Sequence, residues 1–207
     1  MPSHQSSTPE QQAFEENFKK NYAFATLAFP NERWIDASTI KLGAEAEFEI
    51  PKNADKIKVA QSRLTPSKNR NSISDNDAKT LAKELRQASV LVDKGASIFI
   101  LPKRRGADGR FLPGPDALVN GILYEFKTIT GSLRRVETRF RESRGQGQNV
   151  YIRVMNPDIT KNDVIQKMYN IVNGVNYTGG FKGNLIFSIR EKNLDHVYYV
   201  KISDFKK

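Results

Sequence analysis

The sequence predicts a mixed α/β (α+β) fold, in which a mixed β-sheet is flanked by helices and preceded by an N-terminal extension. From residue 76 onward, segments with helical spacing of apolar residues alternate with short runs rich in β-branched and aromatic residues. Between two of these runs lies Asn120-Gly121, a dipeptide that is the strongest short-range signal of a β-hairpin. The composition, 38% hydrophobic and 27% charged, is that of a globular chain.

Residues 1–75 give weaker signals, and we assign them to an N-terminal extension or small subdomain of unknown role. Residues 1–12 are rich in Ser, Pro and Gln and are expected to be disordered. A short helix is expected over 14–29 and strands over 33–51. Residues 53–77 are polar, which predicts a linker or a mobile flap with a domain boundary between 60 and 75.

Residues 76–207 form the main predicted domain, and its elements follow from the periodicity. Capping candidates at the start and Gly95 at the end bound a first helix. The remaining elements are a strand over 96–102, hairpin strands 116–119 and 122–127, a helix over 131–147, a strand over 149–154, a helix over 159–175, and strands over 184–190 and 196–202.

The composition excludes several kinds of chemistry. The chain has no cysteine, which rules out disulfides, Cys-zinc sites and thiol catalysis. Its two histidines, His4 and His196, are far apart in the sequence, which argues against a multi-histidine metal site and a two-histidine ribonuclease centre. No run approaches the roughly 20 apolar residues of a membrane helix, and the N-terminus does not read as a secretory signal.

The charge distribution indicates a polyanionic partner. The formal net charge is +10, which suits nucleic acid or an anionic membrane. Between residues 103 and 144 there are ten Lys or Arg residues against five Asp or Glu, and eight of the ten are arginine. Because arginine binds phosphate through a bidentate fork, this segment favours nucleic acid.

The hairpin "PDALVNGILYEFK" (115–127) concentrates acids and an amine on one face. Side chains two residues apart in a strand share a face, so Glu125 and Lys127 are expected to point the same way. A two-residue turn pairs Val119 with Ile122 and sets Asp116 opposite Glu125. Two carboxylates so close repel each other unless a cation lies between them, and Mg²⁺ prefers such oxygen ligands. A bound water can then become the nucleophile, with Lys127 beside it. The alternative is a solvated strand face with an ion pair contributing about 0–1 kcal/mol.

These motifs resemble two related groups of nucleases. Pro115-Asp116 followed by Glu125-Phe126-Lys127 resembles the PD-(D/E)xK nuclease signature. The run from Glu84 to Val154, with "PDA", "NG", "EFK" and "NV" in order, is similar to the nuclease domain at the C-terminus of some CdiA contact-dependent inhibition toxins. The similarity covers residues 78–202. It implies a restriction-endonuclease-like core and metal-dependent cleavage of tRNA.

The resemblance also implies residue roles. Asp116 and Glu125 would be metal ligands and Lys127 a catalytic lysine, with Mg²⁺ as the ion and Mn²⁺ or Zn²⁺ as alternatives. Glu84, on the first helix of the domain, is the candidate for a supporting catalytic acid, and Asp77 and Asp93 remain alternatives to it.

A set of basic and polar residues around the hairpin is expected to bind nucleic acid, although a solvated helix face is the alternative for the helical arginines. The set is Arg104, Arg105, Arg134, Arg135, Arg139, Arg141 and Gln146.

Other classes of function stay open from the sequence. They are a metal-independent ribonuclease of the barnase/EndoU/colicin/RelE type, a DNA endonuclease of the same fold, and a non-catalytic nucleic-acid-binding protein of a mobile element or phage. The toxin resemblance further implies an acidic immunity protein as partner. It also implies a cytoplasmic site of action, reached by delivery as part of a larger secreted protein.

Overall fold

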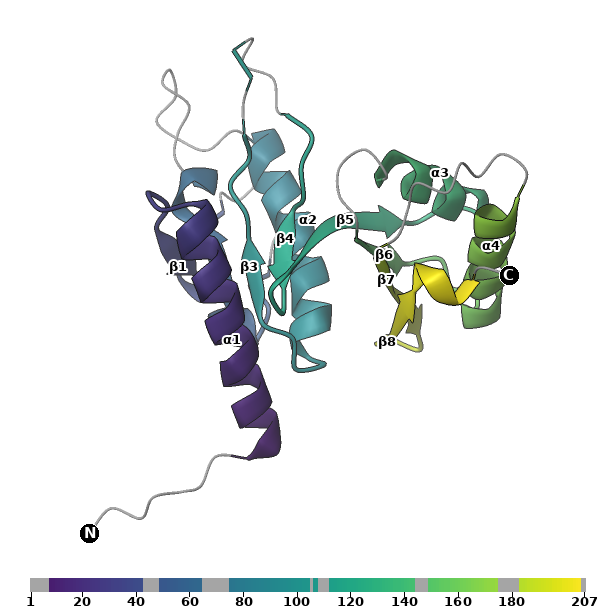
Figure 1. The fold of residues 1–207 in the computed structure, drawn as a ribbon, viewed down its shortest axis with the longest axis horizontal. Helices are drawn as coiled ribbons and strands as arrows, with labels where there is room; N and C mark the ends of the chain where they lie inside the picture. The colour runs from purple at the N-terminus through teal and green to yellow at the C-terminus, as the bar shows by residue number, and fades with distance from the viewer. Residues whose placement is uncertain are drawn as a thin grey trace. The chain divides into compact units, whose positions relative to one another are not determined.

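A computed structural model describes residues 8–42, 49–64, 75–104, 106–107, 112–143, 149–174 and 183–205. Within these residues the fold is mixed α/β, with four α-helices and eight strands that pair both parallel and antiparallel (Figure 1). This confirms the expected mixed sheet with flanking helices. The chain divides into two compact units, residues 1–102 with 118–122 and residues 103–117 with 123–207.

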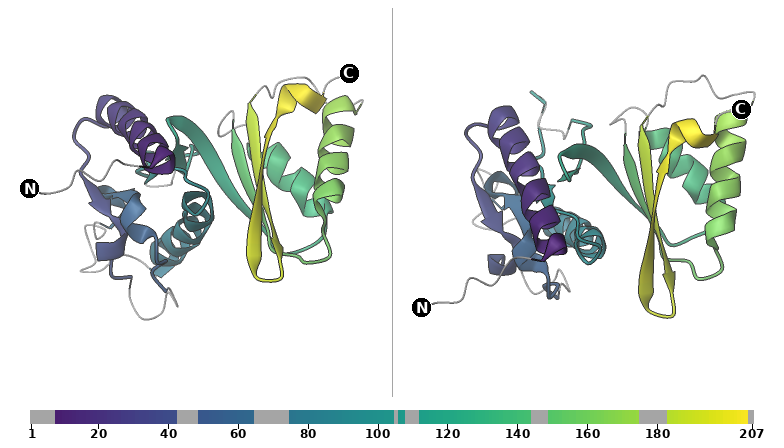
Figure 2. Two further views of the ribbon diagram at one scale, coloured as in Figure 1. Left: turned by 90° about the horizontal axis from the view of Figure 1, so that it is seen from below. Right: turned by 60° about the horizontal axis from the view of Figure 1, so that its bottom comes forward.

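The first unit packs two helices on short strands. Its helices are α1 (Pro9–Ala28) and α2 (Asp75–Val92), and its strands follow the order β1 (Trp34–Asp36), β2 (Ile57–Ala60), β3 (Ile98–Ile100) and β4 (Ala117–Val119), whose first residue belongs to the second unit. Strand β2 runs antiparallel to β1 and parallel to β3. Helix α1 lies on one face of these strands and α2 on the other (Figure 2). Residues on both sides of residue 75 therefore build this unit.

Helix α1 is longer than its sequence pattern predicts. It begins at Pro9 because Thr8 caps it: the Thr8 hydroxyl accepts from the Gln11 backbone N–H, and the Gln11 side chain accepts from the Thr8 N–H. Proline at the first helical position suits the fixed φ angle that the helix requires. The expected disorder is therefore wrong for residues 9–12, and residues 1–7 lie outside the described residues.

The segment expected to be a linker contains a strand. Residues 54–56 and 61–63 form single 3-10 turns, and between them β2 buries Ile57, Val59 and Ala60 completely. A four-residue strand between polar turns is too short to produce a recognisable alternation, which is why the expectation was wrong here. Residues 65–74 lie outside the described residues. Of the strands expected over 33–51, β1 is observed, residues 37–39 form a 3-10 turn, and residues 43–48 are not described.

A buried asparagine of α1 fastens the turn between β4 and the next strand. Asn120 and Gly121 have φ angles of 51° and 82°, as the expected hairpin turn requires. Asn21 is fully buried; its side-chain amide donates to the carbonyl and hydroxyl of Ser97 at 2.7 and 3.1 Å, and its oxygen accepts from the Gly121 N–H. The Asn120 side chain accepts from the Ser97 N–H at 2.8 Å. The turn is thus bonded to α1 and to Ser97, the residue directly before β3.

Replacing Asn21 with leucine is expected to lower the free energy of unfolding by about 2 kcal/mol, because the Gly121 N–H loses its buried acceptor. Urea denaturation followed by circular dichroism measures the change. Asn17→Leu is the matched control: Asn17 lies one turn earlier on α1 and is only half-buried. It should change stability by less than about 0.5 kcal/mol. Equal losses in both variants would contradict the role assigned to Asn21.

The second unit packs two helices on one face of a four-stranded sheet (Figure 2). Its elements are β5 (Ile122–Ile129, with its first residue in the first unit), α3 (Arg134–Ser143), β6 (Val150–Val154), α4 (Lys161–Asn173), β7 (Asn184–Glu191) and β8 (Leu194–Lys201). Strands β5, β6 and β7 are parallel and are joined by crossover connections that contain α3 and α4, and β8 returns antiparallel to β7. The helices and strands expected from residue 76 onward are therefore observed, with shifted ends.

The core of this unit fixes which face of β5 carries which side chains. Ile129 on β5, Val136 and Phe140 on α3, and Val164 and Met168 on α4 belong to one buried apolar cluster. Because side chains alternate along a strand, residues 125 and 127 share the face of Ile129.

No described helix is long and apolar enough to cross a membrane.

Candidate active site

Asp116 forms hydrogen bonds with the two residues that flank Glu125 in β5. Its backbone N–H donates to the carbonyl of Tyr124 at 2.9 Å, and its Oδ2 accepts from the backbone N–H of Phe126 at 2.8 Å. The expectation that Asp116 pairs directly with Glu125 is wrong by one residue, because β4 begins only at Ala117 and Asp116 leaves the regular ladder. The side-chain bond to Phe126 nevertheless brings its carboxylate to Glu125.

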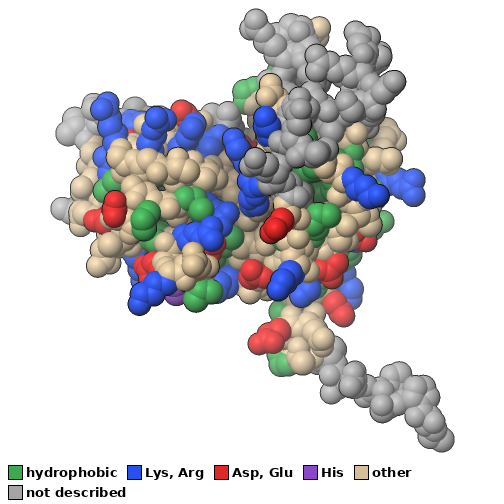
Figure 3. All heavy atoms as spheres, turned by 180° about the vertical axis from the view of Figure 1, so that it is seen from behind, with side chains coloured by type: hydrophobic (Ala, Val, Ile, Leu, Met, Phe, Trp, Pro, Cys, Tyr) green, Lys and Arg blue, Asp and Glu red, His purple; other side chains and the backbone are tan. Residues whose placement is uncertain are grey.

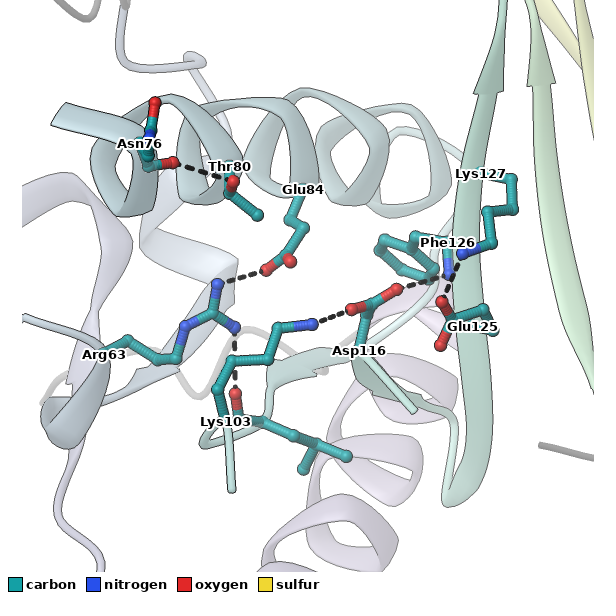
Figure 4. A network of polar contacts seen from close by, with 10 residues as sticks. Arg63, Asn76, Thr80, Glu84, Lys103, Asp116, Glu125, Phe126 and Lys127 are labelled. Atoms are coloured by element: carbon teal, nitrogen blue, oxygen red, sulfur yellow. Dashed lines mark hydrogen bonds and ion pairs between the residues drawn. The ribbon is translucent and has the colours of Figure 1, made fainter. Parts of the chain in front are cut away.

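Glu125 and Lys127 share a face of β5, as the alternation predicts. The Lys127 ammonium donates to Oε1 of Glu125 at 2.6 Å (Figure 4). Phe126 points the other way and packs edge-on against Tyr151, with ring centroids 5.3 Å apart. Phe126 therefore packs on the face of β5 opposite to Glu125 and Lys127.

The two carboxylates are buried. Asp116 and Glu125 are each only 5% exposed, unlike the side chains of a solvated strand face. Both oxygens of Asp116 accept hydrogen bonds, one from Lys103 and one from the Phe126 N–H. Among the residues that the structure describes, Oε2 of Glu125 is buried without a hydrogen-bond partner. A buried carboxylate oxygen left this way is costly unless a proton or a cation satisfies it.

The electrostatics of this pair raise the pKa of Glu125 when no cation is present. Burial, and after it the negative charge of Asp116, raise the pKa of Glu125 from its ordinary 4.5 to a net value of about 7. Hydrogen bonding and charge from Lys127, and the charge of Lys103, oppose the rise but do not cancel it. The side chain thus titrates close to neutral pH.

Two residues that the sequence reasoning missed support the acids. Lys103 forms an ion pair with Oδ1 of Asp116; it follows β3 by three positions in a loop where only the arginines were singled out. The backbone carbonyl of Asn149 accepts a hydrogen bond from the Glu125 N–H at 3.0 Å, and the Asn149 side-chain amide donates to the Leu123 carbonyl at 2.9 Å. In the sequence, the only feature that could have pointed to Asn149 is its position directly before an apolar strand.

Glu84 lies in the first unit and is engaged by an arginine. It is 5% exposed on α2 and pairs with Arg63 at 2.8 Å, while Arg63 also donates to the Leu101 carbonyl at 3.0 Å (Figure 4). Of the alternatives, Asp93 is exposed and accepts from Asn53, and Asp77 is half-buried. Nothing in the sequence singled out Arg63.

The structure thus groups Asp116, Glu125 and Lys127 in the second unit. Among the described residues, no three or more Asp, Glu, His or Cys side chains form a metal-binding group. A bound ion would therefore need ligands beyond the two carboxylates, from water or a substrate phosphate.

The basic residues of α3 are only partly committed to ion pairs. Arg139 pairs with Glu142 at 2.7 Å and Arg141 with Glu137 at 3.0 Å. The exposed Arg134 and Arg135 form no ion pair within the described part of the chain. Figure 3 shows Lys and Arg side chains gathered along one edge of the surface. Arg104 is also exposed, whereas Arg105 and Gln146 lie outside the described residues.

Comparison with known proteins adds no family. No family model matches the chain, and neither a curated protein nor a solved structure matches it. Function is therefore inferred from the residues of the hairpin and their surroundings.

Proposed function

We propose that the chain is a metal-dependent endonuclease of the PD-(D/E)xK type, with a restriction-endonuclease-like core, that hydrolyses phosphodiester bonds in tRNA. The observation that supports the proposal most is the buried pair of carboxylates, Asp116 and Glu125, with one oxygen of Glu125 lacking a hydrogen-bond partner among the described residues. The resemblance of "PDALVNGILYEFK" to the nuclease signature supplies the reaction class.

The residues present suit a hard divalent ion. Asp116 and Glu125 offer only oxygen donors, which Mg²⁺ and Mn²⁺ prefer, whereas Zn²⁺ favours nitrogen and sulfur ligands. Mg²⁺ commonly binds through one or two carboxylates together with substrate phosphate and water. When bound, such an ion supplies a Lewis acid beside the scissile phosphate and lowers the pKa of water.

The ammonium of Lys127 has a defined role in this proposal. One of its three donors is used by Glu125, which fixes the side chain at the site. In this proposal the ammonium also orients the attacking water and offsets the charge that develops on the phosphate. Hydrolysis forms a P–O bond from water and breaks the P–O bond to the leaving sugar oxygen; water loses a proton and the leaving oxygen gains one.

The exposed arginines give the proposed substrate a binding surface. Arg104, Arg134 and Arg135 are exposed, and phosphate contacts of this kind position a nucleic acid without reading its sequence. The toxin resemblance suggests RNA as the substrate, an acidic immunity protein as partner, and a cytoplasmic site of action after delivery within a larger secreted protein.

The proposal is tested by incubating the protein with tRNA and with supercoiled plasmid, each with Mg²⁺ and with EDTA. We expect cleavage of tRNA that EDTA abolishes and no cleavage of plasmid. Cleavage that ignores EDTA and leaves a 2′,3′-cyclic phosphate would instead select a metal-independent ribonuclease. A cut plasmid would select a DNA endonuclease, and salt-sensitive binding without cleavage would select a non-catalytic binding protein.

The affinity for a divalent ion is expected to depend on pH. Because the pKa of Glu125 is raised to about 7, the carboxyl is mostly protonated below that pH and must lose its proton to bind the ion. Mn²⁺ affinity should therefore fall about tenfold per pH unit below 7 and level off above it. Titrations followed by electron paramagnetic resonance at pH 6, 7 and 8 measure this. An affinity that does not change across this range would contradict the raised pKa.

A further inference from the structure

We propose that Lys103 is a second lysine of the active site, which holds Asp116 while the site lacks a metal ion and moves to a phosphate oxygen of the substrate when the ion binds. The inference rests on the proposed function and adds to it a residue that contacts substrate.

The two acids and two lysines form matched pairs. Lys103 pairs with Asp116 and Lys127 pairs with Glu125, so each acid contacts one amine. Figure 4 shows the Lys103 ammonium approaching Asp116 from the side away from the Phe126 N–H. Lys103 is therefore in direct contact with a proposed metal ligand in the metal-free protein.

The hydrogen bonds that the two acids already accept indicate which lysine moves. Glu125 has a second oxygen, Oε2, without a hydrogen-bond partner among the described residues, so it can bind an ion and keep Lys127. Asp116 has no such oxygen: Lys103 takes Oδ1, and the backbone of Phe126 takes Oδ2. The backbone donor is fixed within β5, whereas a lysine side chain can rotate away.

Exposure points to the same lysine. The Lys103 side chain is 24% exposed against 17% for Lys127, and it precedes a loop rather than lying within a strand. An added divalent ion would also repel the neighbouring ammonium. A substrate phosphate brings a negative charge to the same place, so the released Lys103 gains a new anionic partner as the ion takes Asp116.

If Lys103 makes this exchange, one substitution of it should strengthen metal binding and weaken cleavage. In Lys103→Met the ion no longer competes with an ammonium for Asp116, so the dissociation constant for Mn²⁺ in the absence of nucleic acid should fall about tenfold. The same variant loses a phosphate contact, so kcat/KM for the cleaved substrate should fall about 10²-fold. A merely structural role for Lys103 would weaken metal binding and cleavage together.

The experiment compares wild type, Lys103→Met, Lys103→Arg and Lys192→Asn, with folding checked by thermal melting. Lys103→Arg keeps the charge and should bind Mn²⁺ as the wild type does. Lys192→Asn is the charge-matched control: Lys192 is exposed in the β7–β8 turn with φ of 45°, a conformation that asparagine adopts readily. Neither measurement should change in this control.

Two results would overturn the proposal. Unchanged or weaker Mn²⁺ binding by folded Lys103→Met would show that Lys103 does not compete with the ion. The proposed function would still stand in that case if the wild type binds metal and its cleavage depends on Glu125. A wild type that binds no metal and cleaves nothing would overturn the proposed function and this inference together.

Discussion

Replacing Asp116 with asparagine is expected to lower the rate of nucleic-acid cleavage by about 10²–10³-fold while the protein stays folded. The amide oxygen can still accept from the Phe126 N–H, which preserves the bond that anchors the side chain. The change removes the negative charge that a divalent ion requires. It also replaces the ion-pair partner of Lys103 with a neutral amide. Initial rates with labelled tRNA at saturating Mg²⁺ measure the loss.

The control for this variant is Asp158→Asn, the same substitution at an exposed turn position of the second unit. It changes the net charge equally, so it reports any general weakening of nucleic-acid binding. Its rate should remain within about twofold of wild type, since surface changes of this kind have small effects. Equal losses in both variants, or full activity in Asp116→Asn, would contradict the role assigned to Asp116.

Glu125→Gln is expected to abolish cleavage and yet to stabilise the metal-free protein at pH 8 by about 1–2 kcal/mol. The folded-state pKa of Glu125 is raised from 4.5 to about 7, so between these values the folded state holds a proton that the unfolded state has released. The stabilisation from that proton is complete below pH 4.5 and lost as the pH rises through 7. At pH 8 the buried, ionised carboxylate therefore lowers the free energy of unfolding, and a neutral glutamine removes this cost.

The size of the effect follows from the shift. One pKa unit corresponds to about 1.4 kcal/mol, so the shift from 4.5 to about 7 sets an upper limit of about 3–4 kcal/mol for Glu125. Glutamine keeps an acceptor for Lys127 but buries an amide at the unpartnered Oε2 position, which reduces the gain. At pH 5 the stabilisation should be much smaller, because Glu125 is still protonated in the folded protein and pH 5 lies only just above the unfolded-state pKa of 4.5.

Urea denaturation at pH 5 and pH 8 in the presence of EDTA measures this difference. Glu137→Gln is a control with the opposite sign, because hydrogen bonds from Lys167 and Arg141 lower the pKa of Glu137. That variant should lose stability at pH 8 rather than gain it. A Glu125→Gln protein less stable than wild type at pH 8 would contradict the raised pKa.

The sequence alone contains the local part of the site. The Asn120-Gly121 turn and the period-two pattern of β5 predict that Glu125 and Lys127 share a face beside Asp116. Helical spacing likewise predicts α2, α3 and α4. These features depend on neighbouring residues in the chain, which is why a single sequence reveals them.

What the sequence could not supply depends on contacts between distant residues. Asn21 bonds to Gly121 one hundred positions later, and Lys103 reaches Asp116 across an irregular loop. Strand β2 exists because it pairs with β1 and β3, not because four residues carry a strong pattern. The one-residue offset at Asp116 arises where the ladder ends, a detail that turn chemistry does not determine.

The central claim is that Asp116 and Glu125 together hold a divalent ion. Titration of the metal-free protein with Mn²⁺ at pH 8, followed by electron paramagnetic resonance, tests it most directly. We expect wild type to bind one ion per chain and Glu125→Gln to bind none under the same conditions. Equal binding by the two proteins, or no binding by wild type, would contradict the claim.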